Sequence, residues 1–306
     1  MKEIIDCHSH IGRDMYWKNL GSLDEYQRET QKKGVTESFI MPVPSPVYIE
    51  GNKKIIFLKY KHYGQEIKYF KLEEDLKTKE IKKISVRNNC NPYKRANDEL
   101  YNACKNHLSL NYAPLIHPLF YSVDDFCEHI KRGARIFKIH GIACGVTPSM
   151  IKEDFFRIIE YLKVPLLIHT DYSDAENICH YNDANHWLNV LSKYDIKVYF
   201  AHAVRLIQRA IDEVNCDDRY IIGLGPDKII NDASTPMAIK NGNYLEYCLN
   251  VFDIDKIVFD IDYPWNIAGG NDYSLDWDSV DRVKKILSEN EQEKVFCKNI
   301  KNFIRR

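Results

Sequence analysis

Two histidines one residue apart end an apolar segment near the N-terminus. Residues 4–10 read IIDCHSH, and a short apolar run of this kind predicts a β-strand. Successive side chains of a strand point to opposite faces, so we expect Asp6, His8 and His10 on one face and the odd-numbered residues on the other. Two imidazoles on the same face at the end of a strand form half of a metal site.

Further ionisable residues stand at the ends of four later apolar runs. They are Lys138 with His140, then His169, then His202, and finally Asp260 with Asp262. A single histidine or aspartate at such a position is often a hydrogen-bonded structural residue or a helix cap. Four strand ends of this kind would bury several polar groups at a high cost unless the groups share a purpose such as binding a cation. The set therefore predicts a metal site.

The segments that carry these residues alternate between strand and helix patterns. Strands are predicted over 4–10, 35–41, 112–117, 135–140, 165–169, 197–202, 220–224 and 256–262. Helices are predicted over 23–33, 92–106, 123–131, 149–162, 185–194, 204–214, 244–251, 280–287 and 293–303. Eight strands alternating with helices favour an α/β fold, a (β/α)₈ TIM barrel, in which catalytic groups stand at the strand ends.

Residues 47–86 interrupt this alternation after the second strand. Two apolar runs, 55–58 and 67–70, flank a polar turn and predict a β-hairpin-like insertion with lysine-rich edges that discourage pairing with other chains. The insertion serves either as a charge-rich cover or as a lid over the site. Without internal repeats or low-complexity linkers, we expect residues 1–306 to form one barrel domain with this insertion.

Charge and cysteine content limit the classes of partner. The chain has 43 Lys and Arg against 44 Asp and Glu, so its net charge of −1 gives no electrostatic reason to expect nucleic acid or an anionic membrane. Nine cysteines without a C-x-x-C pair, no signal-peptide pattern and no apolar run of spanning length predict a cytoplasmic protein with reduced thiols. We expect a small-molecule substrate, and a homo-oligomer is compatible with the sequence.

The complete set of strand-end residues resembles the amidohydrolase superfamily of metal-dependent hydrolases. In that superfamily H-x-H ends strand one, a ligand stands on strand four, histidines end strands five and six, and an aspartate ends strand eight. Residues 257–264, IVFDIDYP, are similar to the last strand of one branch, and residues 296–303, FCKNIKNF, are similar to its closing helix. Asp260 departs from the branch, in which a glycine is usual.

This resemblance implies a set of metal ligands and a mechanism. The implied ligands are His8, His10, Lys138, His169, His202 and Asp262, holding one or two divalent ions per chain, with Zn²⁺ as the expected metal. The metal supplies hydroxide from a bound water and polarises a carbonyl. Asp262 takes the proton of that water and passes it to the leaving group. His202 is either a second-metal ligand or, in one-metal members, an electrophile beside the carbonyl.

Lys138 has three readings. Burial in an apolar strand lowers the pKa of its amine, and a free amine can take up carbon dioxide. The resemblance then implies a carboxylated lysine that bridges two metals. In a one-metal site Lys138 stays an ammonium that contacts the substrate or Asp260, and it can also be purely structural. His140 is an alternative ligand on the same strand and a candidate for substrate contact.

Loop residues after strands one and eight are candidates for the substrate pocket. Arg13 can hold a carboxylate by a bidentate contact, or it can pair with Asp14 instead. The aromatic and amide candidates are Tyr16, Trp17, Trp265 and Asn266, for which packing is the alternative. His180 and His186 are expected to be solvated surface histidines.

Together these observations predict a metal-dependent hydrolase of the amidohydrolase type, which cleaves a C–N or C–O bond of a small linear or cyclic amide or of a lactone. A one-metal decarboxylase on the same barrel is the nearest alternative. A catalytically silent barrel used for binding is a third reading, and the complete ligand set argues against it.

Overall fold

Eight parallel strands form the centre of the computed structural model, which describes residues 3–13, 20–63, 66–85, 91–170, 179–225, 244–269 and 272–305. The strands are β1 (Ile5–Arg13), β3 (Glu37–Pro42), β8 (Leu110–Tyr112), β9 (Phe137–Ile139), β10 (Leu166–Ile168), β11 (Val198–Phe200), β12 (Tyr220–Gly223) and β13 (Ile257–Val258). They pair as two sheets, one in the order β1-β3-β8 and the other in the order β13-β12-β11-β10-β9.

Two seams close these sheets into a barrel. Between β8 and β9, Leu115 forms a parallel bridge with Lys138. Between β13 and β1, the amide of Cys7 donates to the carbonyl of Phe259 at 3.0 Å. Every strand of the barrel therefore has a neighbour on each side, and the predicted (β/α)₈ barrel is confirmed.

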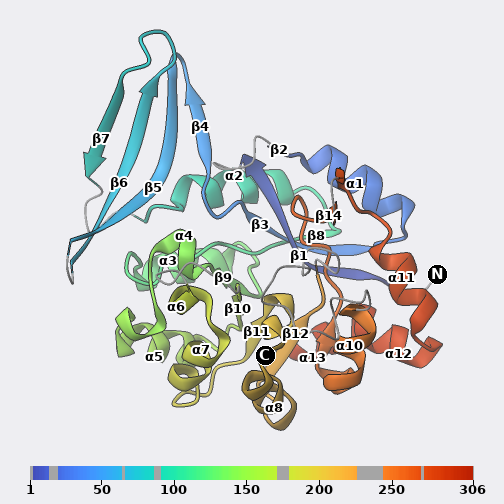
Figure 1. Cartoon of the computed structure of the whole chain (residues 1–306). Coiled ribbons are helices and arrows are strands. Elements are labelled where there is room, and N and C mark those ends of the chain that lie inside the picture. Colours follow the sequence, from blue (N-terminus) through green and yellow to red (C-terminus); the bar gives the residue numbers. More distant parts are fainter. Residues whose placement is uncertain are drawn as a thin grey trace.

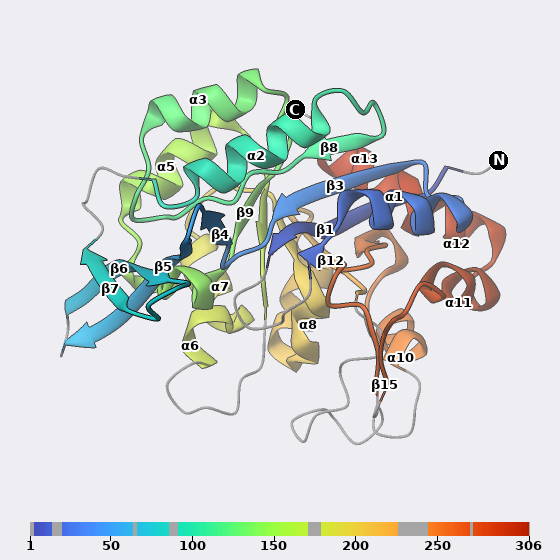
Figure 2. The ribbon, with the colours of Figure 1, turned by 90° about the horizontal axis from the view of Figure 1, so that it is seen from above.

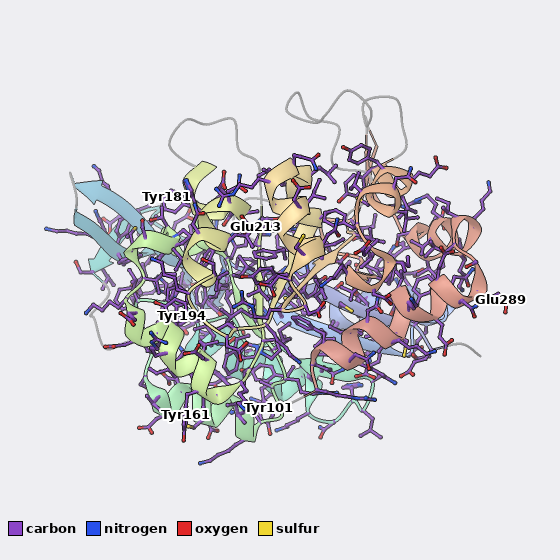
Figure 3. All side chains as sticks on the ribbon, turned by 90° about the horizontal axis from the view of Figure 1, so that it is seen from below. Tyr101, Tyr161, Tyr181, Tyr194, Glu213 and Glu289 are labelled. Carbon is purple, nitrogen blue, oxygen red and sulfur yellow. The ribbon has the colours of Figure 1, made fainter. Side chains whose placement is uncertain are left out.

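Helices surround the strands (Figures 1 and 2). The first half of the chain contributes α1 (Leu23–Lys32), α2 (Lys94–Cys104), α3 (Val123–Lys131), α4 (Gly141–Cys144), η1 (Pro148–Met150) and α5 (Glu153–Leu162). The second half contributes α6 (Cys179–Asn182), α7 (Ala184–Leu191), η2 (Ala201–Leu206), α8 (Gln208–Cys216), α10 (Tyr244–Val251), η3 (Ile254–Lys256), α11 (Ser279–Ile286), α12 (Glu289–Glu293), η4 (Lys294–Lys298) and α13 (Asn299–Phe303). Tyr161 of α5 and Glu289 of α12 lie on the periphery (Figure 3).

Helix α3 shows how local sequence sets these elements. Ser122 and Asp125 form a capping box, in which each backbone N–H donates to the other side chain at 3.1 Å. Phe126, one residue further on, is fully buried, and its ring stacks 5.4 Å from that of Phe137 in β9. A cap and a buried aromatic residue on one face explain why the predicted bounds, 123–131, agree with the structure.

The insertion after β3 is a four-stranded antiparallel sheet. Its strands are β4 (Val47–Glu50), β5 (Lys53–Tyr63), β6 (Glu66–Asp75) and β7 (Ile81–Ser85), paired in chain order. The predicted hairpin corresponds to β5 and β6, and the insertion also contains β4 and β7, which add a strand on each side. The sheet projects from one side of the barrel (Figure 1), and Tyr48 and Ile55 on one of its faces pack against Ala96 of α2.

Two other predictions of secondary structure differ from the fold. The helix expected over 204–214 starts only at Gln208, because residues 202–206 have positive φ angles. The helix expected over 149–162 is divided into η1 and α5. Two short antiparallel elements complete the description, namely β2 (Leu20–Gly21) on β1 and the pair β14 (Ile267–Gly269) and β15 (Asp272–Leu275). Among the described residues, no helix has the length and apolar character needed to cross a bilayer.

Candidate metal centre

Strand β1 brings two imidazoles together through an irregularity in its pairing. Ile5 and Cys7 belong to the cluster that fills the barrel interior, and the register between β1 and β3 shifts between Asp6 and Ser9. After this shift His8 and His10 turn the same way, and their Nε2 atoms lie 2.9 Å apart. The predicted pairing of the two histidines is thus present.

Asp6 does not share their face, so that part of the expectation is wrong. Its Oδ2 accepts hydrogen bonds from the hydroxyl of Tyr26, on helix α1, and from Ser9 Oγ at 2.6 Å. Its Oδ1 accepts from the amide of Ile261 at 2.9 Å, which ties strand eight to strand one. Asp6 is therefore a structural carboxylate behind the site, and the register shift is the reason that simple alternation misplaces it.

Backbone carbonyls fix the orientation of two imidazoles. His10 Nδ1 lies 2.9 Å from the carbonyl oxygen of Pro42, and His202 Nδ1 lies 2.6 Å from that of Gly225. A carbonyl only accepts, so each Nδ1 carries the proton and each Nε2 presents a lone pair. This arrangement is typical of metal-binding histidines, whose second nitrogen donates to an acceptor behind the site. His202 Nε2 lies 3.0 Å from Nδ1 of His169, so a second imidazole pair faces the first.

Asp262 stands between the two imidazole pairs. Its Oδ1 lies 3.7 Å from both His8 Nδ1 and His10 Nε2, and its Oδ2 lies 4.0 Å from His202 Nε2. Ligand atoms of His8, His202 and Asp262, all buried, lie within 4.8 Å of one another. Imidazole nitrogens with a carboxylate oxygen are the donor set of divalent transition metals, so the residues present fit such a cation.

The side chain of Lys138 extends from β9 to the imidazole of His8. It is completely buried, and its Nζ lies 2.8 Å from His8 Nε2. Burial lowers the pKa of the Lys138 amine to about 7, although the charges of Asp262 and Asp260 act in the opposite direction. The pKa of His8 also lies well below its ordinary value, first because the imidazole is buried and second because of the charge of Lys138. The predicted burial of the lysine is confirmed.

His140 accompanies the second imidazole pair. Its ring stacks on that of His169, with centroids 3.9 Å apart and 12° between the planes. Its Nδ1 accepts a hydrogen bond from the amide of Ala143 at 3.3 Å and so caps α4. His140 therefore lies beside His169, and its Nδ1 accepts the hydrogen bond that caps α4.

A left-handed turn after β11 brings in a cation that sequence reasoning missed. All five residues from His202 to Leu206 have φ angles between 46° and 60°, which non-glycine residues rarely adopt. Burial and then the charges of His169 and Arg205 lower the pKa of His202. Burial raises the pKa of Asp262, and the charge of Arg205 acts in the opposite direction. The charge of Arg205 thus acts on the metal centre. In the sequence, only the position of Arg205, three residues after His202, indicated that it lies near the site. The helix predicted over 204–214 included Arg205, so it was not assigned to the end of the strand.

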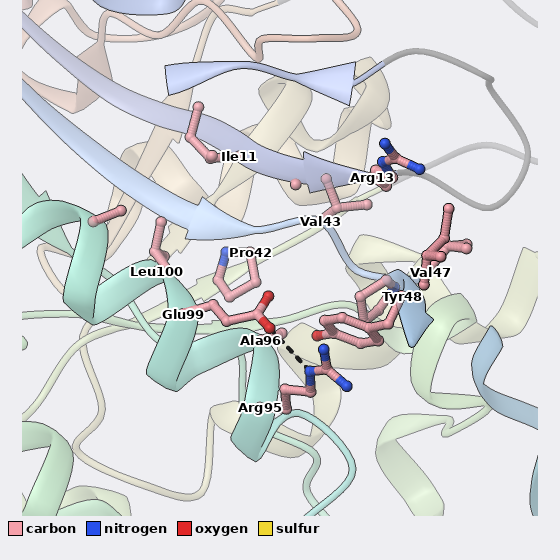
Figure 4. A pocket seen from close by; sticks show the side chains of 14 residues that line it. Ile11, Arg13, Pro42, Val43, Val47, Tyr48, Arg95, Ala96, Glu99 and Leu100 are labelled. Carbon is pink, nitrogen blue, oxygen red and sulfur yellow. Dashed lines mark hydrogen bonds and ion pairs between the residues drawn. The ribbon is translucent and has the colours of Figure 1, made fainter. Parts of the chain in front are cut away.

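The predicted substrate-binding residues have different positions. Trp265 is half-buried, and its ring lies 4.9 Å from that of His10 in an edge-on contact. Arg13 is exposed at the end of β1 and lines a cavity of about 400 Å³ next to α2, together with Tyr48 and Arg95 (Figure 4). The described lining of that cavity includes none of the imidazoles of the metal centre.

The remaining candidates are either structural or outside the described part of the chain. Tyr16 and Trp17 lie outside the described residues, as does the side chain of His180. Asn266 is buried, and its Nδ2 donates to the carbonyl of Asp276 at 2.9 Å, which is a structural role. His186 is half-buried in α7, where its amide donates to Asp183 Oδ1 at 3.1 Å.

Comparisons with known proteins find similarity in fold. No protein-family model matches the chain, and curated protein sequences give no significant match. A probable 2-pyrone-4,6-dicarboxylic acid hydrolase from Acinetobacter baumannii, solved with citric acid bound, has a TM-score of 0.62 at 12% identity, with 99% of each chain covered. An amidohydrolase from Burkholderia multivorans with bound zinc has a TM-score of 0.60 at 11% identity, also with 99% of each chain covered.

A 4-oxalomesaconate hydratase from Rhodopseudomonas palustris has a TM-score of 0.55 at 10% identity, with 98% of this chain and 95% of that chain covered. At these identities the similarity concerns the fold. The chain shares the barrel fold of these three proteins over almost its whole length.

Proposed function

We propose that this chain is a metal-dependent hydrolase that cleaves an amide or lactone bond of a small molecule with a metal-activated water. The observation that carries the proposal is the position of Asp262 between two pairs of imidazoles, 3.7 Å from His10 Nε2 and 4.0 Å from His202 Nε2. A carboxylate in this position can both bind a cation and accept a proton from a water beside it.

The proposed ligands are those of the strand-end set, His8, His10, Lys138, His169, His202 and Asp262. When bound there, a divalent ion, for which Zn²⁺ is our first choice, supplies a water of lowered pKa and polarises the substrate carbonyl. The zinc in the neighbour from Burkholderia supports this choice. His10 and His202 contribute rigidly oriented nitrogens, because their Nδ1 protons are held by the carbonyls of Pro42 and Gly225.

Asp262 is the proposed catalytic base. Burial raises the pKa of its carboxyl well above the ordinary value, and Lys138 acts in the opposite direction. A carboxylate of raised pKa accepts a proton more readily than an exposed one. One of its oxygens would take the proton of the attacking water and then deliver that proton to the leaving nitrogen or oxygen.

The pairing of the imidazoles favours two ions per chain. His8 and His10 with Asp262 would hold one ion, and His169 and His202 would hold the other. The neutral amine of Lys138 would attack carbon dioxide and lose a proton, and the resulting carbamate would supply oxygen ligands in place of a cation. Its lowered pKa supports this step, because a neutral amine is required. With a single ion, Lys138 stays an ammonium, and its 2.8 Å contact with His8 fits that case too.

The neighbours suggest which substrates to try. The protein from Acinetobacter is described as acting on a pyrone dicarboxylate, which is a lactone, and it binds citric acid. Arg205, whose charge acts on His169 and Asp262, is a suitable partner for a substrate carboxylate in this chain. Lactones and cyclic amides that carry a carboxylate are therefore the first compounds to test, with uncharged analogues as matched controls.

The test combines metal analysis with a product assay. Purified protein is expected to contain a divalent metal, measured by elemental mass spectrometry, and to lose turnover of these substrates when the metal is removed by a chelator. Ring-opened acid as the product supports hydrolysis, whereas released carbon dioxide indicates a decarboxylase instead. Protein that binds no metal and turns over none of the compounds, even after addition of Zn²⁺, would contradict the proposal. The alternative of a catalytically silent barrel used for binding would then remain.

A further inference from the structure

Strand eight carries a second buried acid, Asp260, two residues before Asp262. Its Oδ1 accepts a hydrogen bond from the amide of Gly225, and its Oδ2 accepts one from the hydroxyl of Tyr199. Burial raises the pKa of its carboxyl to about 8, and these two hydrogen bonds act in the opposite direction. The resembling branch usually has a glycine here, so the acid needs an explanation in this chain.

The neighbouring strand β12 leaves room for this carboxylate. A Cβ at Gly223 would overlap the Asp260 carboxylate and the Tyr199 hydroxyl. A Cβ at Gly225 would lie 2.6 Å from the backbone oxygen of Asp260 and 2.9 Å from its Oδ1. Real Cβ atoms do not approach other atoms so closely, so two glycines and one tyrosine match the shape of Asp260. The acid therefore belongs to a consistent local arrangement.

The carboxylate lies behind His8. His8 Nδ1 is buried, has no hydrogen-bond partner among the described residues, and lies 3.8 Å from Asp260 Oδ2. The other nitrogen, Nε2, faces the ligand side, where His10 Nε2 is 2.9 Å away. His10 and His202 each have a carbonyl behind Nδ1, so His8 lacks the acceptor that the other two imidazoles have.

We propose that Asp260 is a positioning residue whose Oδ2 accepts the Nδ1 proton of His8 and so keeps the Nε2 lone pair of His8 directed at the metal. A carboxylate behind a metal-binding histidine fixes its tautomer and raises its basicity. Asp262 Oδ1 lies slightly closer to His8 Nδ1, at 3.7 Å, but the Asp262 oxygens also lie within 4.0 Å of His10 Nε2 and His202 Nε2, so Asp262 is assigned to the ligand side. This inference rests on the proposed metal centre.

Two substitutions separate this role from a structural one. In Asp260→Asn, the Gly225 amide keeps the side-chain oxygen where Oδ1 is now, so the NH₂ group faces His8 and donates to Nδ1. That contact favours the tautomer with a proton on Nε2, which cannot bind a metal through Nε2. In Asp260→Gly, the cavity costs stability, but no donor opposes the correct tautomer. We therefore expect Asn to damage metal binding more, and Gly to damage the stability of the metal-free protein more.

The experiment measures Zn²⁺ affinity by chelator competition and thermal stability without metal. Asp260→Asn should bind Zn²⁺ about 10–100-fold more weakly than wild type, which is the usual effect of losing such a partner. Tyr199→Phe, which keeps the carboxylate and loses one donor to it, is the matched control and should have a smaller effect. Proton–nitrogen NMR correlations of metal-free protein should show His8 protonated on Nδ1 in wild type and on Nε2 in Asp260→Asn.

The outcomes are distinct. Wild-type affinity in Asp260→Asn, or an unchanged His8 tautomer, overturns the role of Asp260 but leaves the metal centre intact. Greater loss of affinity in the Gly variant than in the Asn variant would show a structural residue and also overturns it. A wild-type protein that binds no Zn²⁺ at all defeats the proposed metal centre, and the role of Asp260 with it.

Discussion

The barrel centre and the projecting sheet use the same ionisable residues in opposite ways. In the centre, Lys138 is completely buried against His8, and the pKa of its amine falls to about 7. In the sheet, every residue of β7, including its two lysines, is exposed. There Lys71 Nζ lies 2.8 Å from Glu73 Oε1 in an ion pair that water and salt can screen.

This difference indicates where substitutions should have large effects on activity or stability. Charges removed from water interact strongly and keep shifted pKa values, because no solvent competes for them. Exposed charges on a sheet maintain solubility and limit edge pairing, and each contributes little to stability. We therefore expect large and specific effects at the barrel centre and small, additive effects on the sheet.

The largest effect is expected from removing an imidazole of β1. His8→Ala and His10→Ala should each lose most of the bound metal and of the activity, because their Nε2 atoms lie 2.9 Å apart and serve one cation. Far-ultraviolet circular dichroism should show that the barrel remains folded. His107→Ala, at an exposed position, is the control and should retain its metal. Full metal content in a double His8→Ala, His10→Ala variant, measured by mass spectrometry, would place the metal elsewhere.

The next effect concerns the proposed base. Asp262→Asn should keep the fold and much of the metal, since an amide oxygen can still coordinate and asparagine tolerates the φ of 58° at this position. Turnover should fall by about 10²–10⁴-fold, because the amide cannot accept a proton. Steady-state kinetics with metal content measured in parallel test this. Activity within a few-fold of wild type would assign the base to another group, with Asp260 as the first candidate.

A third effect distinguishes the bridging carbamate of Lys138 from its other two readings. If the lysine carries a bridging carbamate, Lys138→Ala should reduce two metals per chain to one or none, and added short-chain carboxylate should restore part of the loss. Elemental analysis with and without the carboxylate measures this. One metal per chain in both proteins would exclude the bridge and leave the ammonium and the purely structural lysine.

The sequence predicted which side chains lie close together, because the geometry of a barrel determines where its strand ends meet. Their roles as metal ligands remain predictions. Once His8, Lys138, His169, His202 and Asp262 are placed at the ends of parallel strands, closure of the barrel brings them together. Local backbone detail was not predictable in this way. The register shift after Asp6 and the left-handed turn around Arg205 break the regular periods that pattern reading relies on.

The fold was predicted well where caps and periodicity agree, as in α3, and less well in the insertion. Strand β7 could not be recognised, because all of its residues are exposed and it has no buried face to create an alternating pattern. The one-domain organisation, the cytoplasmic location and a homo-oligomer remain predictions.

Acid should destabilise the barrel through buried histidines. Burial lowers the pKa of His129, which lies 2.9 Å from the Tyr112 hydroxyl, to about 4, against about 6.5 in an unfolded chain. The unfolded state therefore binds more protons between about pH 6.5 and pH 4, and stability falls as the pH falls through that window. His129→Gln should reduce this loss by up to roughly 3 kcal/mol. Urea unfolding at several pH values measures it.

His107→Gln is the matched control for this prediction, because it makes the same substitution at a histidine whose side chain is exposed. Its stability should follow the pH dependence of wild type. The same pH dependence in His129→Gln as in wild type would show that other groups cause the acid loss.

The smallest effect is expected at the exposed edge of the projecting sheet, where one substitution can be compared at two positions. Ile81 in β7 is 66% exposed, whereas Ile55 in β5 is 6% exposed and packs with Tyr48 and Ala96. Ile→Val removes one methylene at either position. At Ile55 it should cost about 0.5–1.5 kcal/mol of unfolding free energy, because it leaves a gap in a packed contact. At Ile81 the change should stay within about 0.5 kcal/mol, because water already surrounds the side chain.

Urea unfolding of both variants measures these two changes in unfolding free energy, and the Zn²⁺ affinity of each variant should equal that of wild type. Equal losses at the two positions would show that β7 is covered in solution and that the sheet is not the exposed region described above.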